Sequence, residues 1–439
     1  MSLPRVLGFW DVIGIIVGGV IGSGIFIVPA SVAAGVESPI LIIAVWIVGG
    51  VLCFFGALSF SELGAAYPQA GGMYVFLREA YGPLVGFLFG WTLFLVIDSG
   101  AVATLAVAFS TRYLPHFFRL SPLLSKAISV GLIALLVAVN SIGVRWGATL
   151  QNLLTLIKFG GLVSICAIVF AFAKGSTSHF FSPRPQSFSL NLLGRFGVAL
   201  VAILWAYKGW EGSTFSAGEI KKPEKNLPTG LFVGTLIIIS IYLITNLAYL
   251  YALPSTEIAK SSRIAADAMN FAIGPIGASI IALIILFSIT GAANQNILCS
   301  PRVYFAMAKD GLFFKKIEKI HPKFLTPHFS IIAIGTWSAI LSLSGTFEQL
   351  FTYVIFAQWI FFGLTVAAVI ILRKKRPDIP RPYKTWGFPV TSIIFILAAL
   401  FISVNSLINQ FWNALVGLII ILLGIPAYLY WNRKRKLNY

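Results

Sequence analysis

Long apolar runs limit what this chain of 439 residues can fold into. Hydrophobic residues make up 58% of the sequence and charged residues only 10%, whereas a soluble domain is about 25% charged. A helix needs about 20 apolar residues to cross the hydrocarbon core of a bilayer. Roughly twelve such runs fit the sequence: 10–34, 39–66, 84–111, 122–141, 149–173, 194–218, 229–253, 274–306, 327–344, 349–372, 388–408 and 411–431. The sequence therefore predicts an all-α polytopic membrane protein, and the polar stretches between the runs, such as 254–270, are expected to be loops.

An even number of spans places both termini on one side of the membrane, and the charges indicate which side. Of the 32 Lys and Arg residues, Lys158 and Lys208 fall inside predicted spans, and 22 of the other 30 lie on the side of the termini. Cytoplasmic loops are enriched in Lys and Arg. We therefore expect cytoplasmic termini in a plasma (inner) membrane, and the formal charge of +18 requires no nucleic-acid partner.

Two of the runs contain glycine clusters that predict interrupted helices. Gly22-Ser23-Gly24 lies near the middle of the first span, and Gly209 and Gly212 flank the centre of the sixth. Backbone polar groups in a membrane must be paired, so a helix breaks only against protein or a water-filled cavity. Glycines also allow close packing of membrane helices. Two breaks, each in the first span of a five-span half, nevertheless favour a transporter built from inverted repeats.

Broken helices also indicate what kind of molecule binds. The N-terminus of a half-helix presents free amides and a partial positive charge, which suit a carboxylate. Carbonyls released at a half-helix C-terminus suit an ammonium group. The pattern therefore predicts a site for the zwitterionic backbone of an amino acid, with the Ser23 hydroxyl as a further donor.

Four ionisable residues fall well inside the predicted spans: Asp98, Lys158, Lys208 and Glu211. An unpaired charge at the centre of a membrane helix costs roughly 2.5–3.5 kcal/mol on insertion scales, so such residues are candidate functional groups. Lys158 is a candidate proton carrier or a fixed substitute for a bound cation, with a structural ammonium as the alternative. Lys208 and Glu211 lie three residues apart and would pair on an intact helix, whereas Asp98 would line a cavity or meet Lys208.

Four motifs in the chain resemble the amino acid–polyamine–organocation (APC) superfamily of transporters, in particular its L-type amino acid transporter branch and bacterial relatives. They are VIGSGIF (Val20 to Phe26), GALSFSELGAAYPQAGGMYVFLREAYGP (Gly56 to Pro83), AYKGWEGSTFSAGEIKKPEKNLP (Ala206 to Pro228) and RVYFAMAKDGLFF (Arg302 to Phe314). The resemblance implies one transporter domain over 1–439 with a LeuT-like fold. Its parts would be a 5+5 inverted repeat, with repeat 1 at about 8–175 and repeat 2 at about 190–373, followed by two extra helices at about 388–431.

The resemblance also implies residue roles. The substrate carboxylate would bind the amides near Gly22 to Gly24, and Trp205 would close over the substrate as an aromatic gate. Lys158 matches a lysine that occupies the sodium position of sodium-dependent relatives, so it is the predicted coupling residue. Trp205 and Glu211 are the predicted gating residues. The predicted substrate-binding residues are Val20, Ile21, Gly22, Ser23, Gly24, Trp205, Ala206, Lys208 and Gly209.

The predicted function is sodium-independent secondary transport of neutral amino acids, by exchange or import through alternating access. The alternative is a proton-coupled amino acid or amine transporter with charged substrates, because Lys208 and Glu211 depart from a plain neutral site. A channel or receptor fits less well, since neither a repeated pore ring nor a sensory domain is present. We expect no enzyme activity, cofactor or metal, because the four His residues lie in loops and the three Cys residues lie in apolar runs.

Partner proteins are constrained by the same sequence. The resembling animal transporters bond a heavy chain through a Cys between their third and fourth helices, and no Cys occurs between Arg112 and Lys126. We therefore expect no disulfide-linked heavy chain, and a monomer or weak homo-oligomer in the lipid bilayer.

Overall fold

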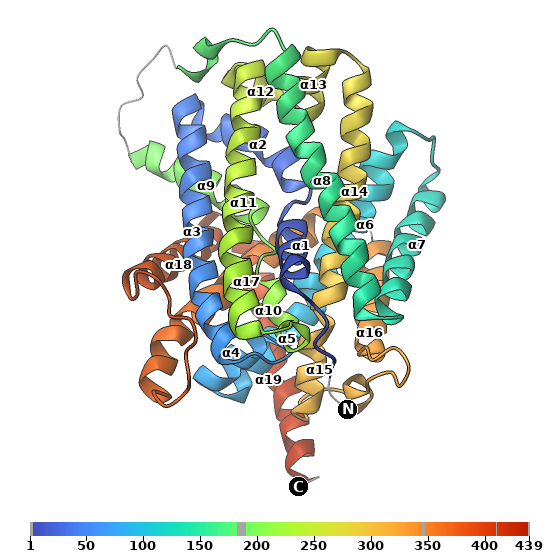
Figure 1. Ribbon diagram of the computed structural model, residues 1–439, viewed down its shortest axis with the longest axis vertical. Coiled ribbons are helices and arrows are strands. Elements are labelled where there is room, and N and C mark those ends of the chain that lie inside the picture. The colour runs from blue at the N-terminus through green and yellow to red at the C-terminus, as the bar shows by residue number, and fades with distance from the viewer. Residues whose placement is uncertain (1–2, 182–189, 345–346, 410, 438–439) are drawn as a thin grey trace.

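The structure is a computed structural model that describes residues 3–181, 190–344, 347–409 and 411–437, and it is a bundle of helices (Figure 1). The first half of the chain forms α1 (Phe9–Val20), α2 (Gly24–Val36), α3 (Pro39–Ala66), α4 (Met73–Tyr81), α5 (Pro83–Thr92), α6 (Asp98–Ala108), α7 (Pro122–Ser141) and α8 (Val144–Phe172). The second half forms α9 (Leu190–Ala206), α10 (Gly212–Phe215), α11 (Pro223–Ala252), α12 (Ser255–Lys260), α13 (Ile264–Ile273), α14 (Ile276–Cys299), α15 (Pro301–Lys309), α16 (His328–Leu343), α17 (Phe347–Lys375), α18 (Val390–Asn409) and α19 (Phe411–Leu437).

The predicted class, an all-helical membrane protein, is confirmed. Among the described residues, nine helical stretches are long and apolar enough to cross a membrane, and the bent pair α1 and α2 forms a tenth. The other two predicted runs correspond to the shorter apolar helices α9 and α16. Both termini lie at the same end of the bundle (Figure 1), as an even number of spans requires.

Two of the predicted spans contain irregular turns that place the functional residues. In the third span, a π-helical segment, η1 (Leu93–Ile97), joins α5 to α6, and a second one, η2 (Phe109–Tyr113), follows α6. Such single π-helical turns are frequent at functional sites. In the eighth span, α14 ends at Cys299 and α15 begins at Pro301. Asp98 therefore follows directly on one irregular turn, and Ser300 lies at the other junction.

The segment 254–270 departs from the sequence prediction of a loop. It contains α12 and the first part of α13. Ile264 and Met269 of α13 are buried, and α13 packs against α14 and α8. The segment is too short and too polar to read as a span, but its alanines favour helix and its apolar side chains bury against longer helices.

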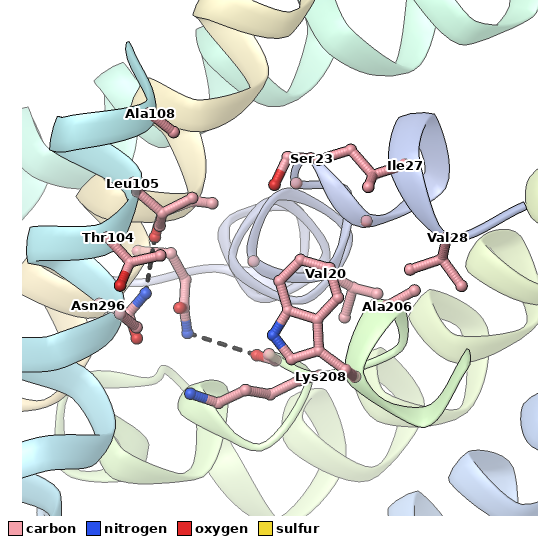
Figure 2. A pocket seen from close by; sticks show the side chains of 18 of the residues that line it. Val20, Ser23, Ile27, Val28, Thr104, Leu105, Ala108, Ala206, Lys208 and Asn296 are labelled. Atoms are coloured by element: carbon pink, nitrogen blue, oxygen red, sulfur yellow. Dashed lines mark hydrogen bonds between the residues drawn. The ribbon is translucent and has the colours of Figure 1, made fainter. Parts of the chain in front are cut away.

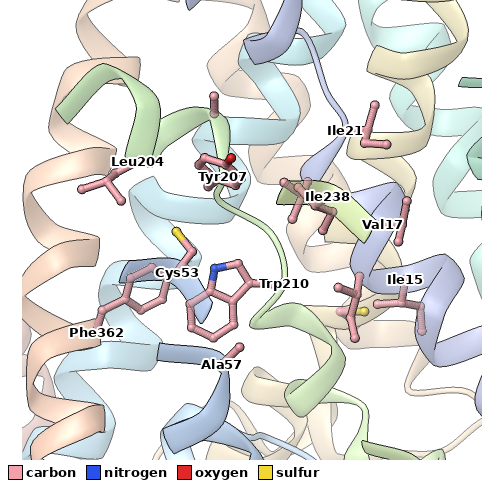
Figure 3. Close-up of a cluster of buried hydrophobic side chains, with 14 of the residues drawn as sticks. Ile15, Val17, Ile21, Cys53, Ala57, Leu204, Tyr207, Trp210, Ile238 and Phe362 are labelled. Carbon is pink, nitrogen blue, oxygen red and sulfur yellow. The ribbon is translucent and has the colours of Figure 1, made fainter. Parts of the chain in front are cut away.

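An aromatic core fixes the segment that follows α9. Trp210 is 2% exposed, and its ring lies 4.8 Å from Phe60 edge-on and 5.5 Å from Phe362 in a stacked pair. Cys53 and Tyr207 belong to the same cluster (Figure 3). Aromatic pairs contribute about 0.5–1.5 kcal/mol beyond the burial of their area. The non-helical backbone around Trp210 is therefore held in one position despite its lack of helical hydrogen bonds.

Candidate substrate site

The first predicted break is present between α1 and α2, whose axes differ by 43°. The break spans Ile21 to Ser23, and α2 starts at Gly24. A Cβ atom at Gly24 would lie 2.9 Å from the Cα atom of Ala206, at the end of α9. Glycine is therefore required at the start of α2, because the two interrupted spans approach each other there.

The second break separates α9 from α10, over Tyr207 to Glu211. Gly209 has a φ of +124°, a conformation that L-residues rarely adopt. A Cβ atom at Gly209 would also lie 2.6 Å from the carbonyl carbon of Gly19. The two breaks thus touch through glycine backbone, which explains why glycines occur at these positions of both spans.

Side chains from α11 and α14 bind the carbonyls that the breaks release. The Tyr242 hydroxyl donates to the Val20 carbonyl at 2.9 Å and lies 3.2 Å from the Ala206 carbonyl. Ser288 lies within hydrogen-bond distance of the carbonyls of Ile21 and Gly22, at 3.0 and 3.2 Å. A further contact joins the Gln295 amide to the Gly209 carbonyl at 3.4 Å. These side chains were not predicted from the sequence, although a polar residue inside an apolar run is a signal that could have indicated them.

A cavity of about 420 Å³ lies beside the two breaks (Figure 2). Eight of the nine predicted substrate-binding residues line it, and Ile21, which is fully buried, does not. Further lining side chains come from α6 and α14, among them Thr104, Leu105 and Asn296 (Figure 2). A volume of this size, largely apolar with a few converging polar groups, is typical of a small-molecule site. The cavity continues past Ser31 of α2 to Tyr113 of η2, away from the end with both termini.

The amides at the start of α2 face this cavity with their hydrogen-bonding capacity unused. Among the hydrogen bonds of the described residues, none involves the backbone N–H of Ser23 or Gly24, whereas the nearby carbonyls have side-chain donors. Helix N-termini favour anionic groups. The geometry therefore suits a carboxylate at the position that the sequence indicated.

Lys158 lies outside the cavity lining, on α8 behind α1. Its side chain is fully buried, and its ammonium donates to the Gly18 carbonyl on the last turn of α1. Three more contacts from α8 reach α1. The Thr155 hydroxyl and the Gln151 amide donate to the Gly14 carbonyl at 3.0 and 3.5 Å, and the Asn152 amide donates to Asp11 at 2.7 Å. A row of polar groups on α8 therefore holds the half-helix that precedes the first break.

Sequence comparison identifies the family of the chain. A model of a family described as amino acid permease matches residues 7–425. The chain belongs to the amino acid permease family. Its members carry amino acids across membranes, so the protein is an amino acid transporter with multiple spans and not an enzyme. The predicted membership of the APC superfamily is confirmed.

Three relatives cover nearly the whole permease. The serine/threonine exchanger SteT of Bacillus subtilis is 34% identical over 440 residues, which are 99% of this chain and 98% of the relative. The mouse b(0,+)-type amino acid transporter 1 is 32% identical, with coverage of 97% and 88%. The human cystine/glutamate transporter is 31% identical, with coverage of 99% and 87%. The relatives are thus amino acid transporters whose names indicate different substrates.

The structure shows the partners of the other three intramembrane charges, Asp98, Lys208 and Glu211, which the sequence could not decide. Lys208 lines the cavity and donates to Asp98 at 3.3 Å, and Ser300 donates to the second oxygen of Asp98. Glu211 does not line the cavity; it accepts from the Gly209 amide at 2.9 Å and from Gln358 at 2.8 Å. Lys208 therefore pairs with Asp98 rather than with Glu211, because the break at Gly209 removes the helical geometry that would join Lys208 to Glu211.

Ion pairs join the helices at the end of the permease that contains the termini. Arg302 and Glu219 form a pair with two contacts, at 2.6 and 3.0 Å, in which both side chains are fully buried. The carbonyl of Glu219 also accepts from the amides of Val6 and Leu7, so the segment before α1 is held in place there. The cavity is therefore separated from this end of the permease by packed and paired side chains.

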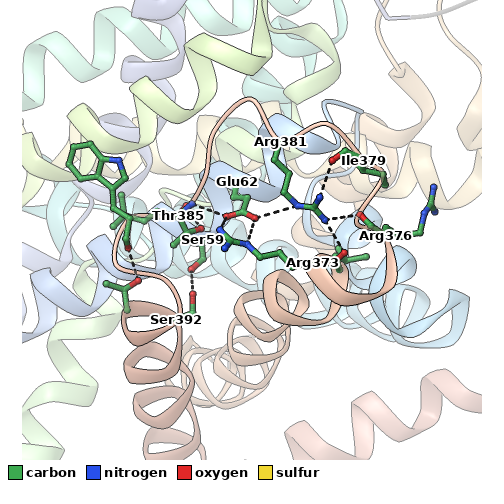
Figure 4. Close-up of polar contacts among 12 residues, drawn as sticks. Ser59, Glu62, Arg373, Arg376, Ile379, Arg381, Thr385 and Ser392 are labelled. Carbon is green, nitrogen blue, oxygen red and sulfur yellow. Dashed lines mark hydrogen bonds and ion pairs between the residues drawn. The ribbon is translucent and has the colours of Figure 1, made fainter.

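Two further clusters lie at the same end. Arg373 forms two hydrogen bonds to Glu62, at 2.8 and 2.6 Å, and the Thr385 amide donates to the same carboxylate (Figure 4). In the second cluster, Asp310 accepts from Tyr74 and from Arg78. Burial, together with the Asp310 carboxylate, raises the pKa of Tyr74 well above its usual value. The Tyr74 phenol therefore stays protonated and keeps its role as a donor across the physiological pH range.

No metal site is found in the described part of the chain, where no group of three or more His, Cys, Asp or Glu side chains is arranged to hold an ion. The three cysteines are buried free thiols.

Proposed function

We propose that this permease is a sodium-independent exchanger of neutral amino acids that works by alternating access. The contact between the Lys158 ammonium and the Gly18 carbonyl is the observation on which the proposal depends. A cation fixed by a covalent bond is already present at the end of α1 and neutralises the partial negative charge of that helix terminus. A dissociable cation such as sodium is then not needed to hold α1 in place.

The position of the cavity supports alternating access. It extends away from the end with the termini, and buried ion pairs hold the helices together at that end. By the distribution of Lys and Arg, the end with the termini is cytoplasmic. The structure then corresponds to an outward-facing state, in which the amides of Ser23 and Gly24 bind the substrate carboxylate and Trp205 lies beside it. Movement of α1 away from α8 would open the cytoplasmic side.

Exchange of small neutral substrates is favoured by one of the relatives. The serine/threonine exchanger of Bacillus subtilis covers almost the whole chain. Serine and threonine are therefore the first substrates to test, followed by larger neutral amino acids.

Uptake of labelled serine into proteoliposomes tests the proposal. We expect uptake that requires unlabelled serine inside the vesicles and that is unchanged when sodium is replaced by choline. A requirement for sodium would contradict the proposal, as would the absence of transport for every neutral amino acid.

The second candidate function is proton-coupled transport, which the complete burial of Lys158 supports. Uptake into empty vesicles that is driven by an inward proton gradient would favour this candidate over exchange.

A further inference from the structure

Lys208 separates the substrate cavity from a buried carboxylate. It projects along the cavity floor towards α6 (Figure 2), where its ammonium lies 3.3 Å from Asp98. The Lys208 side chain is 15% exposed and lines the cavity, whereas the Asp98 side chain is 5% exposed and does not. The cavity floor therefore presents the lysine of an ion pair, with the aspartate behind it.

Asp98 is held in place independently of Lys208. It is the first residue after the π-helical segment η1, so its side chain leaves α6 at an irregular turn. Its second oxygen accepts from Ser300, at the junction of α14 and α15. Removal of the Lys208 ammonium would therefore leave a carboxylate that stays in position next to the cavity.

The other charged groups near the cavity do not take part in this pair. Glu211 packs on the far side of the second break, where the Gly209 amide and Gln358 occupy its oxygens. Arg112, in η2, also lines the cavity, but it lies 14 residues after Asp98 and therefore about 20 Å further along the span. Within the described residues, the formal charge of the cavity floor is therefore set by Lys208 and Asp98, and it sums to zero.

We propose that the Lys208–Asp98 pair sets the charge selectivity of the permease. The neutral pair makes the floor a poor partner for a charged side chain of either sign, so uncharged amino acids are favoured. A cationic side chain meets the Lys208 ammonium, while an acidic one meets an ammonium already bound by Asp98. Removal of one partner leaves the other as an unpaired charge, which attracts side chains of the opposite sign. The proposal rests on the proposed function, because it concerns the substrates of the same site.

Three variants test the rule, with ornithine and glutamate as probes. Each purified variant is reconstituted with internal serine, and both probes are tested as competitors of labelled serine uptake. For Lys208→Met, we expect ornithine to gain about tenfold or more in competition relative to serine. For Asp98→Asn, we expect a gain of the same size for glutamate. The double variant should again discriminate against ornithine and glutamate, because it removes the charges of Lys208 and Asp98 together. Lys174→Met is the matched control, because it replaces an exposed lysine that does not line the cavity. It should leave the competition by both probes unchanged.

The outcomes distinguish this proposal from the proposed function. Serine exchange by Lys208→Met with unchanged competition by ornithine would overturn the charge rule and leave the proposed function intact. Failure of the unmodified permease to exchange any neutral amino acid would overturn the proposed function instead. If Lys208→Met does not fold, Lys208→Gln and Asp98→Asn test the same rule separately. The unmodified permease supplies a further readout, since competition by ornithine or glutamate as strong as that by serine would overturn the rule.

Discussion

Lys158→Met is the substitution that tests how α1 is held. The methionine side chain fills nearly the same volume but has no ammonium to donate to the Gly18 carbonyl. A hydrogen bond from a charged group contributes about 1.5–3 kcal/mol. The contact stabilises the state in which α1 packs against α8. Its loss should shift the balance towards detached α1 by about 10- to 150-fold, since each 1.4 kcal/mol is a factor of ten.

Other contacts from α8 to α1 determine how far α1 detaches in the Lys158→Met variant. Thr155 and Asn152 still bind α1 in the variant, so α1 should detach more often without unfolding. We expect serine exchange to slow by at least tenfold, because closure at the end with the termini becomes the limiting step. The assay is homoexchange of labelled serine in proteoliposomes between pH 5 and about pH 9, where an exposed lysine would still be charged.

A matched control compares the loss of a neutral hydrogen bond with the loss of the charged one at the same interface. Thr155→Val removes a neutral hydrogen bond to the Gly14 carbonyl, which contributes about 0.5–1.5 kcal/mol, and should therefore slow exchange by a smaller factor than Lys158→Met does. If Lys158→Met exchanges serine at the rate of the unmodified permease over the whole pH range, the ammonium does not hold α1. The basis of the proposed function would then be lost.

Three other substitutions and one substrate analogue give further predictions. Arg302→Met leaves a buried carboxylate unpaired and should destabilise the detergent-solubilised protein by about 3–5 kcal/mol, measured by thermal unfolding. Gly14→Ala would bring a Cβ atom within 1.9 Å of the Asn152 amide oxygen and should slow exchange by displacing α1. Tyr242→Phe should weaken serine binding in a competition assay, because the Val20 carbonyl at the first break loses its donor. Serine methyl ester should compete at least about tenfold less well than serine, because the ester lacks the carboxylate that we propose to bind the amides at the start of α2.

The spans and the breaks were predictable because both follow from local composition. Twelve apolar runs reflect the thickness of a bilayer. The glycine clusters reflect the close approach of Gly24 to Ala206 and the positive φ of Gly209. The partners of the charged residues were not predictable in the same way. Lys208 and Asp98 are 110 residues apart, and their pairing depends on how two irregular helices meet.

The polar side chains around the breaks were missed for a similar reason. Tyr242, Ser288 and Gln295 lie inside apolar runs, and a polar residue there equally suits a hydrogen bond within its own helix. Thr245 on α11 is such a case, since its hydroxyl donates to the Ile241 carbonyl. Only the packing of α11 and α14 against the breaks distinguishes the two roles.

At the first break, the carbonyls have side-chain donors within the protein, whereas the amides of Ser23 and Gly24 do not have acceptors among the described residues. At the first break, side chains of α11, α14 and α8 bind the carbonyls at the end of α1, whereas the amides of Ser23 and Gly24 have no partner among the hydrogen bonds of the described residues. Buried carbonyls and amides both require partners in a membrane protein. The protein thus supplies donors for the carbonyls and leaves the amides to be satisfied from the cavity, by water or by a bound carboxylate. A bound carboxylate would complete the hydrogen bonding of the break, and the interruption of the helix would then contribute directly to the proposed recognition of an amino acid.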